Sequence, residues 1–348
     1  MRRLIVLLAI VLLSSSCSTI PASGTAPLRV LTHDSFAVSE TVLAAFTRET
    51  GITIEILPAG DAGAALNRAI LTRDTPLADV LFGVDNTFLG RALGSELFAP
   101  YDSPALTSFP PDLRLDDTNR LLPVTIGYVT INYDRAELDR RDLMPPASLA
   151  ELTDPRWRGL LVVQNPATSS PGLAFLLATI ATFGETGSYT WRDYWRDLRA
   201  NDVLVSEGWT DAYYTQFSGS SGKGPRPLVV SYATSPAAEV FFSDGKLSEP
   251  PTGSMAAGAF RQIEFIGILA STQRRNDAVR FVDFVLGRSF QADIALQMFV
   301  YPALPGVATP AVFTQFAPIP TAAVRMDPQQ IDAGREGWIA EWTTIVLR

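Results

Sequence analysis

The sequence predicts an α/β fold built on mainly parallel strands and divided into two domains. From Leu28 onward, short apolar runs typical of strands alternate with amphipathic stretches typical of helices. Strand–helix–strand order at this spacing indicates a parallel sheet with helical crossovers. The chain has 348 residues, of which 47% are hydrophobic and 18% charged, and this is long enough for two domains. Ligands of such sheets bind where the strands end, so polar and aromatic residues at the strand ends are the candidate site residues.

Predicted strands and helices alternate along the first half of the chain. Period-two and buried apolar runs predict strands, and apolar spacing of three to four residues predicts helices. Gly51 is typical of a helix C-terminus. A long β-branched run at 121–134 has room to pass between domains. The predicted strands are 28–33, 52–59, 78–85 and 121–134, the predicted helices are 40–51 and 62–74, and a helix, a turn and a strand follow over 146–165.

The second half continues in the same way and ends in a helix. Its last segment, 327–348, is amphipathic and places Trp338, Trp342 and Ile345 on one face. The run 276–298 predicts one or two helices. The other predicted helices are 172–184, 189–200, 211–219 and one from 236 to 245, and the other predicted strands are 202–209, 226–232 and 260–271.

The N-terminus predicts export and a lipid anchor. Arg2 and Arg3 precede a short apolar run that is too short to span a membrane well. Residues 1–16 therefore resemble a bacterial lipoprotein signal, with Cys17 as the lipidated residue and 17–27 as a flexible tether. Cys17 is the chain's only cysteine, so an intramolecular disulfide is excluded. The alternative is a plain secretory signal with an incidental cysteine.

Composition argues against several function classes. The formal net charge of -8 and the sequence pI of about 4.8 disfavour nucleic-acid binding and suit a cationic ligand. His33 is the only histidine, and no catalytic or nucleotide-binding motif is present. We therefore expect no enzymatic activity, no cofactor and no metal site.

Two similar corners follow predicted strands. The first corner is Ala-Thr-Ser-Ser-Pro at 167–171, and the second corner is Ala-Thr-Ser-Pro at 233–236. Serine before proline suits a helix start, because serine caps free N–H groups and proline fits the first turn. The remaining N–H groups and hydroxyls are suited to hold a phosphate or hydroxyl group. The alternative is that each corner only caps its helix.

Aromatic and acidic residues lie near the same strand ends. Trp209 and Tyr232 are placed to stack on a flat heterocycle or a cation, although a buried core Trp is the alternative. Carboxylates at strand ends can hold a cation or accept from an amine, or they can cap the next helix; they are Asp34, Asp61 and Asp85. The adjacent Tyr213 and Tyr214 leave a tyrosinate iron site as a further possibility.

Taken together, these segments resemble a known family. The pieces that carry the resemblance are THDSFAVS, ADVLFGVDN, NPATSSPGLAFLL, SEGWTDAYY, LVVSYATSPA, MFVYPAL and REGWIAEW. Over nearly all of 28–348 they resemble, in order, the thiamine-binding proteins of bacterial ABC importers. These proteins have the type II periplasmic-binding-protein fold and are related to ferric-ion binders. The resemblance implies two α/β lobes with a ligand cleft between them. Chain order predicts one lobe of 28–121 plus 253–300 and the other of 122–252 plus 301–348.

The resemblance also implies the ligand contacts. The family's motif positions fall on Asp61 and Ala62, Ser169 and Ser170, the stacking Trp209, and the turn formed by Tyr232, Ala233, Thr234 and Ser235. Asp34 and Asp85 complete the expected set. This chain departs from the family at the ring end of the ligand, where His33 replaces a tyrosine and Ala238 an aromatic residue. The loop after DSFA is also shorter and lacks a tryptophan.

The resulting expectation is a lipid-anchored extracytoplasmic receptor. It would bind thiamine or a thiamine phosphate, act as a monomer, and deliver the ligand to an ABC permease with its ATPase. A ferric-ion or phosphonate receptor of the same fold is the alternative within the class. The alternatives from other classes are an enzyme acting on a thiamine-like heterocycle and a structural surface protein.

Overall fold

The computed structural model describes residues 26–221 and 224–348. The expected signal at 1–16, lipidation at Cys17 and nearly all of the tether lie outside the described residues. Among the helices within these ranges, none is both long enough and apolar enough to cross a bilayer.

The strands form one continuous hydrogen-bonded sheet. Its main path runs β2-β1-β3-β10-β5-β8-β6-β7, with β4 on β10 and with β9 and β11 on β5. The strand bounds are β1 Leu28–Thr32, β2 Ile54–Pro58, β3 Val80–Asp85, β4 Phe98–Ala99, β5 Leu122–Asp134, β6 Leu161–Gln164, β7 Leu204–Ser206, β8 Leu228–Tyr232, β9 Thr252–Ser254, β10 Phe260–Leu269 and β11 Tyr301–Pro302.

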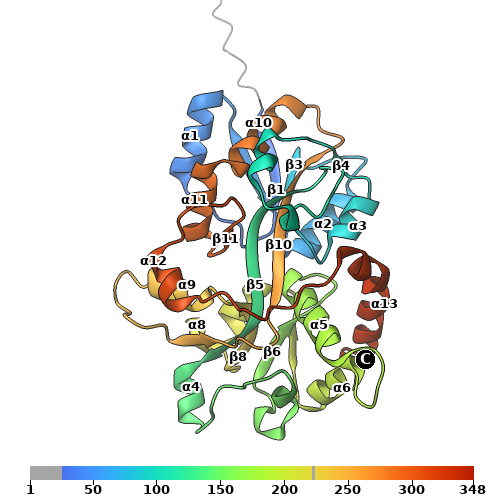
Figure 1. Ribbon diagram of the computed structural model, residues 1–348, viewed down its shortest axis with the longest axis vertical. Helices are drawn as coiled ribbons and strands as arrows, with labels where there is room; N and C mark the ends of the chain where they lie inside the picture. Colours follow the sequence, from blue (N-terminus) through green and yellow to red (C-terminus); the bar gives the residue numbers. More distant parts are fainter. Residues whose placement is uncertain (1–25, 222–223) are drawn as a thin grey trace, which may run out of the picture.

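Helices cover this sheet in two groups. Their bounds are α1 Glu40–Thr50, α2 Ala62–Leu71, α3 Leu89–Gly94, α4 Arg135–Arg140, α5 Ser170–Phe183, α6 Trp191–Ala200, α7 Trp209–Asp211, α8 Ser218–Ser221, α9 Ser235–Phe241, α10 Arg275–Leu286, α11 Arg288–Gln297, α12 Ala311–Phe316 and α13 Pro328–Val346. In Figure 1 the upper half holds α1, α2, α3, α10 and α11, and the lower half holds α4, α5, α6, α8 and α9.

Two long strands join the halves. Figure 1 shows β5 and β10 running through the waist of the molecule. The strands β1, β2 and β3 are parallel in the upper half, as are β6, β7 and β8 in the lower half. Both long strands are antiparallel to their neighbours on the main path. The expected parallel pairing therefore holds within each half, while the connection between the halves is antiparallel. The terminal helix α13 packs against α6 in the lower half and α3 in the upper half.

Several element boundaries differ from the sequence-based expectation. The helix expected near residue 150 is a short 3₁₀ turn at Ala150–Thr153, because Pro155 disfavours helical backbone at the residue before it. The helix expected at 211–219 is a π-helical turn at Ala212–Gln216. The run 276–298 forms two helices, which are separated by extended backbone at Gly287.

Both corner helices begin earlier than expected, α5 at Ser170 instead of residue 172 and α9 at Ser235 instead of residue 236. Ser169, not Ser170, is the N-cap of α5, and its hydroxyl oxygen accepts from the backbone N–H of Gly172 at 3.4 Å. Thr234, not Ser235, precedes α9, and its side chain makes no capping bond. The two serines expected to cap are therefore free for other partners.

Candidate ligand-binding site

A central cavity of about 680 Å³ lies where the two halves meet. Its walls come from the loops after β1 and β2 in the upper half and from the starts of α5, α7 and α9 in the lower half. Strands β5 and β10 supply further lining residues. The two corners, 60 residues and more apart in the chain, both reach it through Ser170 and Ser235. This convergence makes the cavity the candidate site.

Asp61 accepts hydrogen bonds from both halves of the molecule at one side of this cavity. Its carboxylate accepts the backbone N–H of Ala62 at 2.7 Å, which caps α2 in the upper half. The same carboxylate accepts N–H groups of the lower half from Trp209 at 2.9 Å and Ser170 at 3.3 Å. Burial raises the pKa of Asp61, although the hydrogen bonds from the Trp209 N–H, the Ser169 hydroxyl and the Ala62 N–H oppose the change.

Asp85 lies behind the cavity wall rather than in it. Its side chain is fully buried, and Oδ1 accepts from the N–H and the hydroxyl of Thr87, both at 2.6 Å. Oδ2 accepts the Ser170 hydroxyl and the Nε2 of Gln262, the latter at 3.2 Å. Burial raises the pKa of Asp85 to about 6, against these bonds. Asp85 is therefore placed to position two lining residues.

A buried His–Glu pair forms another part of the wall. His33 Nε2 lies 3.0 Å from Glu264 Oε1, and the Thr125 hydroxyl donates to Glu264 Oε2 at 3.0 Å. All three residues line the cavity. Burial lowers the pKa of His33, but the hydrogen bond and charge of Glu264, with the charges of Asp61 and Asp34, raise it overall.

One buried acceptor in this wall has no partner. Gln262 is 5% exposed and lines the cavity, and its Oε1 makes no hydrogen bond to any described residue. The bond from Nε2 to the Asp85 carboxylate fixes the orientation of the amide, because the carbonyl oxygen would be repelled there. A buried acceptor without a donor is costly and calls for an explanation, such as a bound ligand.

Trp209 lies in the part of the cavity wall that the lower half supplies, and its neighbours fix its orientation. Its indole Nε1 donates to the Ser231 hydroxyl at 2.8 Å, and Ser231 in turn lies 2.9 Å from Ser235 Oγ. The ring of Tyr213 is stacked on it at 5.0 Å between centroids and 17° between planes. Trp209 is half-buried and lines the cavity, so it is available as a stacking surface.

The other end of the cavity is apolar. Phe242 and Phe299 line it together with Ala238, Leu247 and Met298. The rings of Phe242 and Phe299 lie 5.2 Å apart between centroids. Sequence analysis named Ala238 and the segment that contains Met298 and Phe299, but it did not single out Phe242, Leu247 or Phe299 as ligand contacts. Their spacing is that of ordinary core residues, and only the packing of α9 near the end of α11 brings them to the cavity.

Most of the expected site residues line the cavity, and three do not. Those that do are Asp34, Asp61, Ala62, Ser170, Trp209, Tyr232, Thr234 and Ser235. Ser169 and Ala233 are buried, with 0% and 2% exposure, and Asp85 is buried behind Ser170. Helix capping is the alternative role for the carboxylates at strand ends. Asp61 does cap α2, whereas Asp34 caps no helix, because α1 starts after Ser39.

Sequence analysis missed two polar residues in β10. Gln262 and Glu264 alternate along an otherwise largely apolar strand, which places both on the same face. Polar side chains two residues apart in a strand predicted to be buried are a usable signal, because burial of such groups requires partners.

The described residues offer little for a metal ion. Among them no group of three or more His, Cys, Asp or Glu side chains is arranged to hold one. The hydroxyl of Tyr213 donates to Glu239 Oε1 at 2.7 Å, and burial raises the pKa of Tyr213 well above its ordinary value. Formation of a tyrosinate is therefore disfavoured at this position.

Comparisons with known proteins agree with this architecture. A family model described as bacterial extracellular solute-binding protein matches residues 75–322. The thiamine-binding periplasmic protein of Salmonella typhimurium is 31% identical over 94% of this chain and 96% of its own length. The iron uptake protein A1 of Synechocystis sp. is 24% identical over 82% of this chain and 79% of its own.

A solved structure of a periplasmic thiamin binding protein has the same fold. It superposes with a TM-score of 0.80 at 28% identity, covering 92% of this chain and 96% of that chain. The expected type II periplasmic-binding-protein fold is thus confirmed, as is the resemblance on which that expectation rested. The chain belongs to the family of bacterial extracellular solute-binding proteins.

Proposed function

We propose that this protein binds thiamine in the central cavity and delivers it to the permease of an ABC importer. The observation that carries the proposal is the convergence of Ser170, Ser235 and Trp209 on one cavity between the two halves. The 31% identity to a thiamine-binding periplasmic protein over nearly the whole chain supports the choice of ligand.

The chemistry of the cavity suits this ligand. Thiamine carries a cationic thiazolium ring, an aminopyrimidine ring and a hydroxyethyl group. The indole of Trp209 offers a π face to the cation, and the nearby carboxylates of Asp61 and Glu264 favour positive charge. Closure of two lobes about a hinge at β5 and β10 is the motion by which such a site takes up and releases its ligand.

The N-terminal sequence indicates where this protein acts. We infer that it acts outside the cytoplasm as a monomer, anchored by lipidated Cys17, and that it changes no bond in its ligand. Palmitate labelling of the wild type and of Cys17→Ala, expressed in a bacterial host, tests the anchor. Label in the wild type alone supports it, and its absence from both contradicts it.

Calorimetry with thiamine and with ferric citrate tests the ligand. We expect thiamine to bind with one-to-one stoichiometry and to quench tryptophan fluorescence, and the recovered ligand to be chemically unchanged. Trp209→Ala should remove most of the quenching, whereas Trp191→Phe, a change in the buried core, should leave it intact. A coloured ferric complex without thiamine binding would replace this proposal with an iron receptor.

A further inference from the structure

A second pocket, of about 400 Å³, lies on the outside of the molecule between α3 and α13. Figure 1 shows α13 below α2 and α3, and the pocket is lined by Ile70 of α2, Arg91 of α3, and Arg335 and Glu336 of α13. It is called the outer pocket below. We propose that the outer pocket binds a small oxyanion, such as phosphate or a dicarboxylate, between its two arginines. This site is separate from the central cavity and does not depend on what that cavity binds.

Arg335 is the buried cation of the outer pocket. Its side chain is 6% exposed, and its guanidinium carbon lies 4.6 Å from the centroid of the Phe88 ring. Nη1 donates to Glu336, but Nε is buried and donates to no described residue. Water cannot replace the missing partner of a buried N–H group, so such groups are normally hydrogen-bonded. Arg335 therefore lacks an acceptor at a place where a bound oxyanion can supply one.

Arg91 supplies a second cation. Its Nη2 donates to Asn67 Oδ1 at 2.8 Å and its Nη1 to Glu336 Oε1 at 3.4 Å. Its Nε, like that of Arg335, is buried without a partner among the described residues. Two guanidinium groups thus share one oxygen of Glu336. Guanidinium groups bind carboxylates and phosphates through two N–H groups at once, so both arginines have capacity for a further oxyanion.

The charges of the outer pocket differ in depth. Its lining holds two arginines and two carboxylates, those of Asp332 and Glu336, so the formal charges balance. Both acidic residues are exposed, and the Glu336 side chain is 72% exposed, whereas the Arg91 and Arg335 side chains are 35% and 6% exposed. Water screens the exposed carboxylates more effectively than the buried guanidinium group. The deeper part of the pocket is therefore positive, and an incoming anion competes there with a weakly held Glu336.

The pKa of Arg335 is consistent with a shortage of negative charge. Burial lowers this pKa, and the charge of Arg91 lowers it as well, while the charge and hydrogen bond of Glu336 and the charge of Asp85 raise it. Repulsion between the two arginines thus exists in this arrangement. A negative charge bound between them would offset that repulsion.

A purely structural role is the alternative for these arginines. In that role Glu336 is their proper partner, and its neutralisation should only weaken the contact between α13 and α3. If an oxyanion binds instead, Glu336 is its competitor, and neutralisation should strengthen anion binding. The two roles therefore predict opposite results for Glu336→Gln.

Calorimetry on the full exported chain, with inorganic phosphate and with malonate at pH 7.5, measures the site. We expect one anion to bind per chain with a Kd of about a millimolar or tighter. Sodium chloride at equal ionic strength should compete weakly, because chloride has no pair of oxygens for a guanidinium group. An excess of thiamine should leave the binding intact. Failure of both anions to bind, or their displacement by thiamine, would overturn the proposal, whereas failure of thiamine to bind would contradict only the proposed function.

Variants locate the anion in the outer pocket. Glu336→Gln should tighten phosphate binding severalfold, and Arg91→Gln should weaken it about tenfold or more. Arg335→Gln should abolish it, with circular dichroism as the check that this variant is folded. Arg192→Met is the matched control, because Arg192 pairs with Glu341 of the same helix α13 but lies outside the pocket. Phosphate affinity should not change in this control.

The variants also decide against the proposal if it is wrong. Phosphate affinity that is unchanged in both Glu336→Gln and Arg91→Gln would place the anion elsewhere. Weaker binding in Glu336→Gln would leave the two arginines with a structural role alone. A loss in Arg192→Met as large as that in Arg91→Gln would show a general effect of surface charge and no specific site.

Discussion

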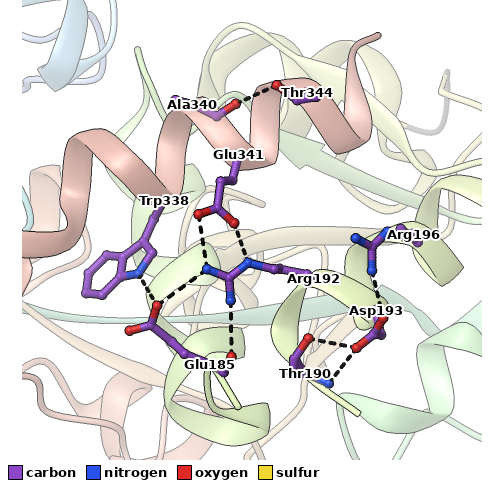
Figure 2. A network of polar contacts seen from close by, with 9 residues as sticks. All are labelled: Glu185, Thr190, Arg192, Asp193, Arg196, Trp338, Ala340, Glu341 and Thr344. Atoms are coloured by element: carbon purple, nitrogen blue, oxygen red, sulfur yellow. Dashed lines mark hydrogen bonds and ion pairs between the residues drawn. The ribbon is translucent and has the colours of Figure 1, made fainter. Parts of the chain in front are cut away.

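Two networks of polar side chains connect distant segments of this protein. They differ in burial and in whether each hydrogen-bonding group has a partner. On the outer surface, Arg192 of α6 bonds both carboxylate oxygens of Glu341 on α13, and Trp338 donates to Glu185 at 3.1 Å, as Figure 2 shows. Arg192 also lies 3.6 Å from Glu185. Each carboxylate there faces a donor, and the glutamates remain 46% exposed. Around the cavity, Glu264 and Gln262 are nearly fully buried, and an acceptor remains unpaired.

The same residue types thus make exposed ion pairs on the surface and buried, partly unpaired contacts at the cavity. An exposed ion pair gains little, because water screens it and competes for its groups. A buried acceptor without a donor carries a large cost, which a ligand can remove. Carboxylates alone therefore do not distinguish the cavity. One unpaired acceptor does not distinguish it either, because Asn132 Oδ1 and Gln164 Oε1 are also buried without a partner among the described residues and do not line it.

The largest expected effect comes from Asp61. Asp61→Ala should weaken thiamine binding about a hundredfold or more and lower the free energy of unfolding by roughly 2–4 kcal/mol, because N–H groups from both halves lose their acceptor. Calorimetry and urea titration measure the two changes. Full affinity in this variant would show that the Asp61 bridge is not needed for the site.

The next effect is that of the stacking residue. Trp209→Ala should weaken binding about tenfold or more, whereas Trp209→Phe keeps a π face and should lose less. Both variants also lose the bond to Ser231, so the difference between them isolates the ring. Equal loss in the two variants would assign the effect to the hydrogen bond instead.

The third prediction is a pH dependence. Asp85, with a pKa of about 6, faces Ser170, Thr87 and Gln262, with the charges of Glu264 and Arg335 nearby. A bound cation stabilises the ionised carboxylate, so affinity should be constant above about pH 7 and fall as the pH drops through 6. Protonated His33 acts in the same direction.

His33→Gln separates the two groups in that experiment. Calorimetry between pH 7.5 and 5 should still show the fall near pH 6 in this variant, because Asp85 is unchanged. Affinity that stays constant down to pH 5 in the wild type would show that no carboxylate of the wall titrates in this range.

The smallest effect is expected on the outer surface. Arg192→Met removes the ion pairs and the guanidinium group that lies over the Trp191 ring, so stability should fall by only about 1–2 kcal/mol. Thiamine affinity should not change, because α13 contributes no lining residue. A clear loss of affinity would mean that the contact between α13 and α6 is coupled to the cavity.

Much of the fold and part of the site followed from local patterns. Strand and helix periodicity predicted the α/β class, and the two Ser-Pro corners with Trp209 predicted where the cavity would be lined. Such features depend on a few neighbouring residues, since backbone direction, capping and side-chain periodicity act over one or two turns. Three residues chosen in this way, Ser170, Ser235 and Asp61, line the cavity, and their role in binding stays a prediction.

The sequence by itself determined this framework, and the tertiary structure decided which polar groups remain available. Asp85 holds Gln262 across 177 residues of chain, and Asp61 takes the N–H groups of Ser170 and Trp209 from another half of the molecule. No local pattern encodes such pairings, because they depend on how the strand ends of both halves meet. The charge and donor balance of the cavity arises only when those ends come together.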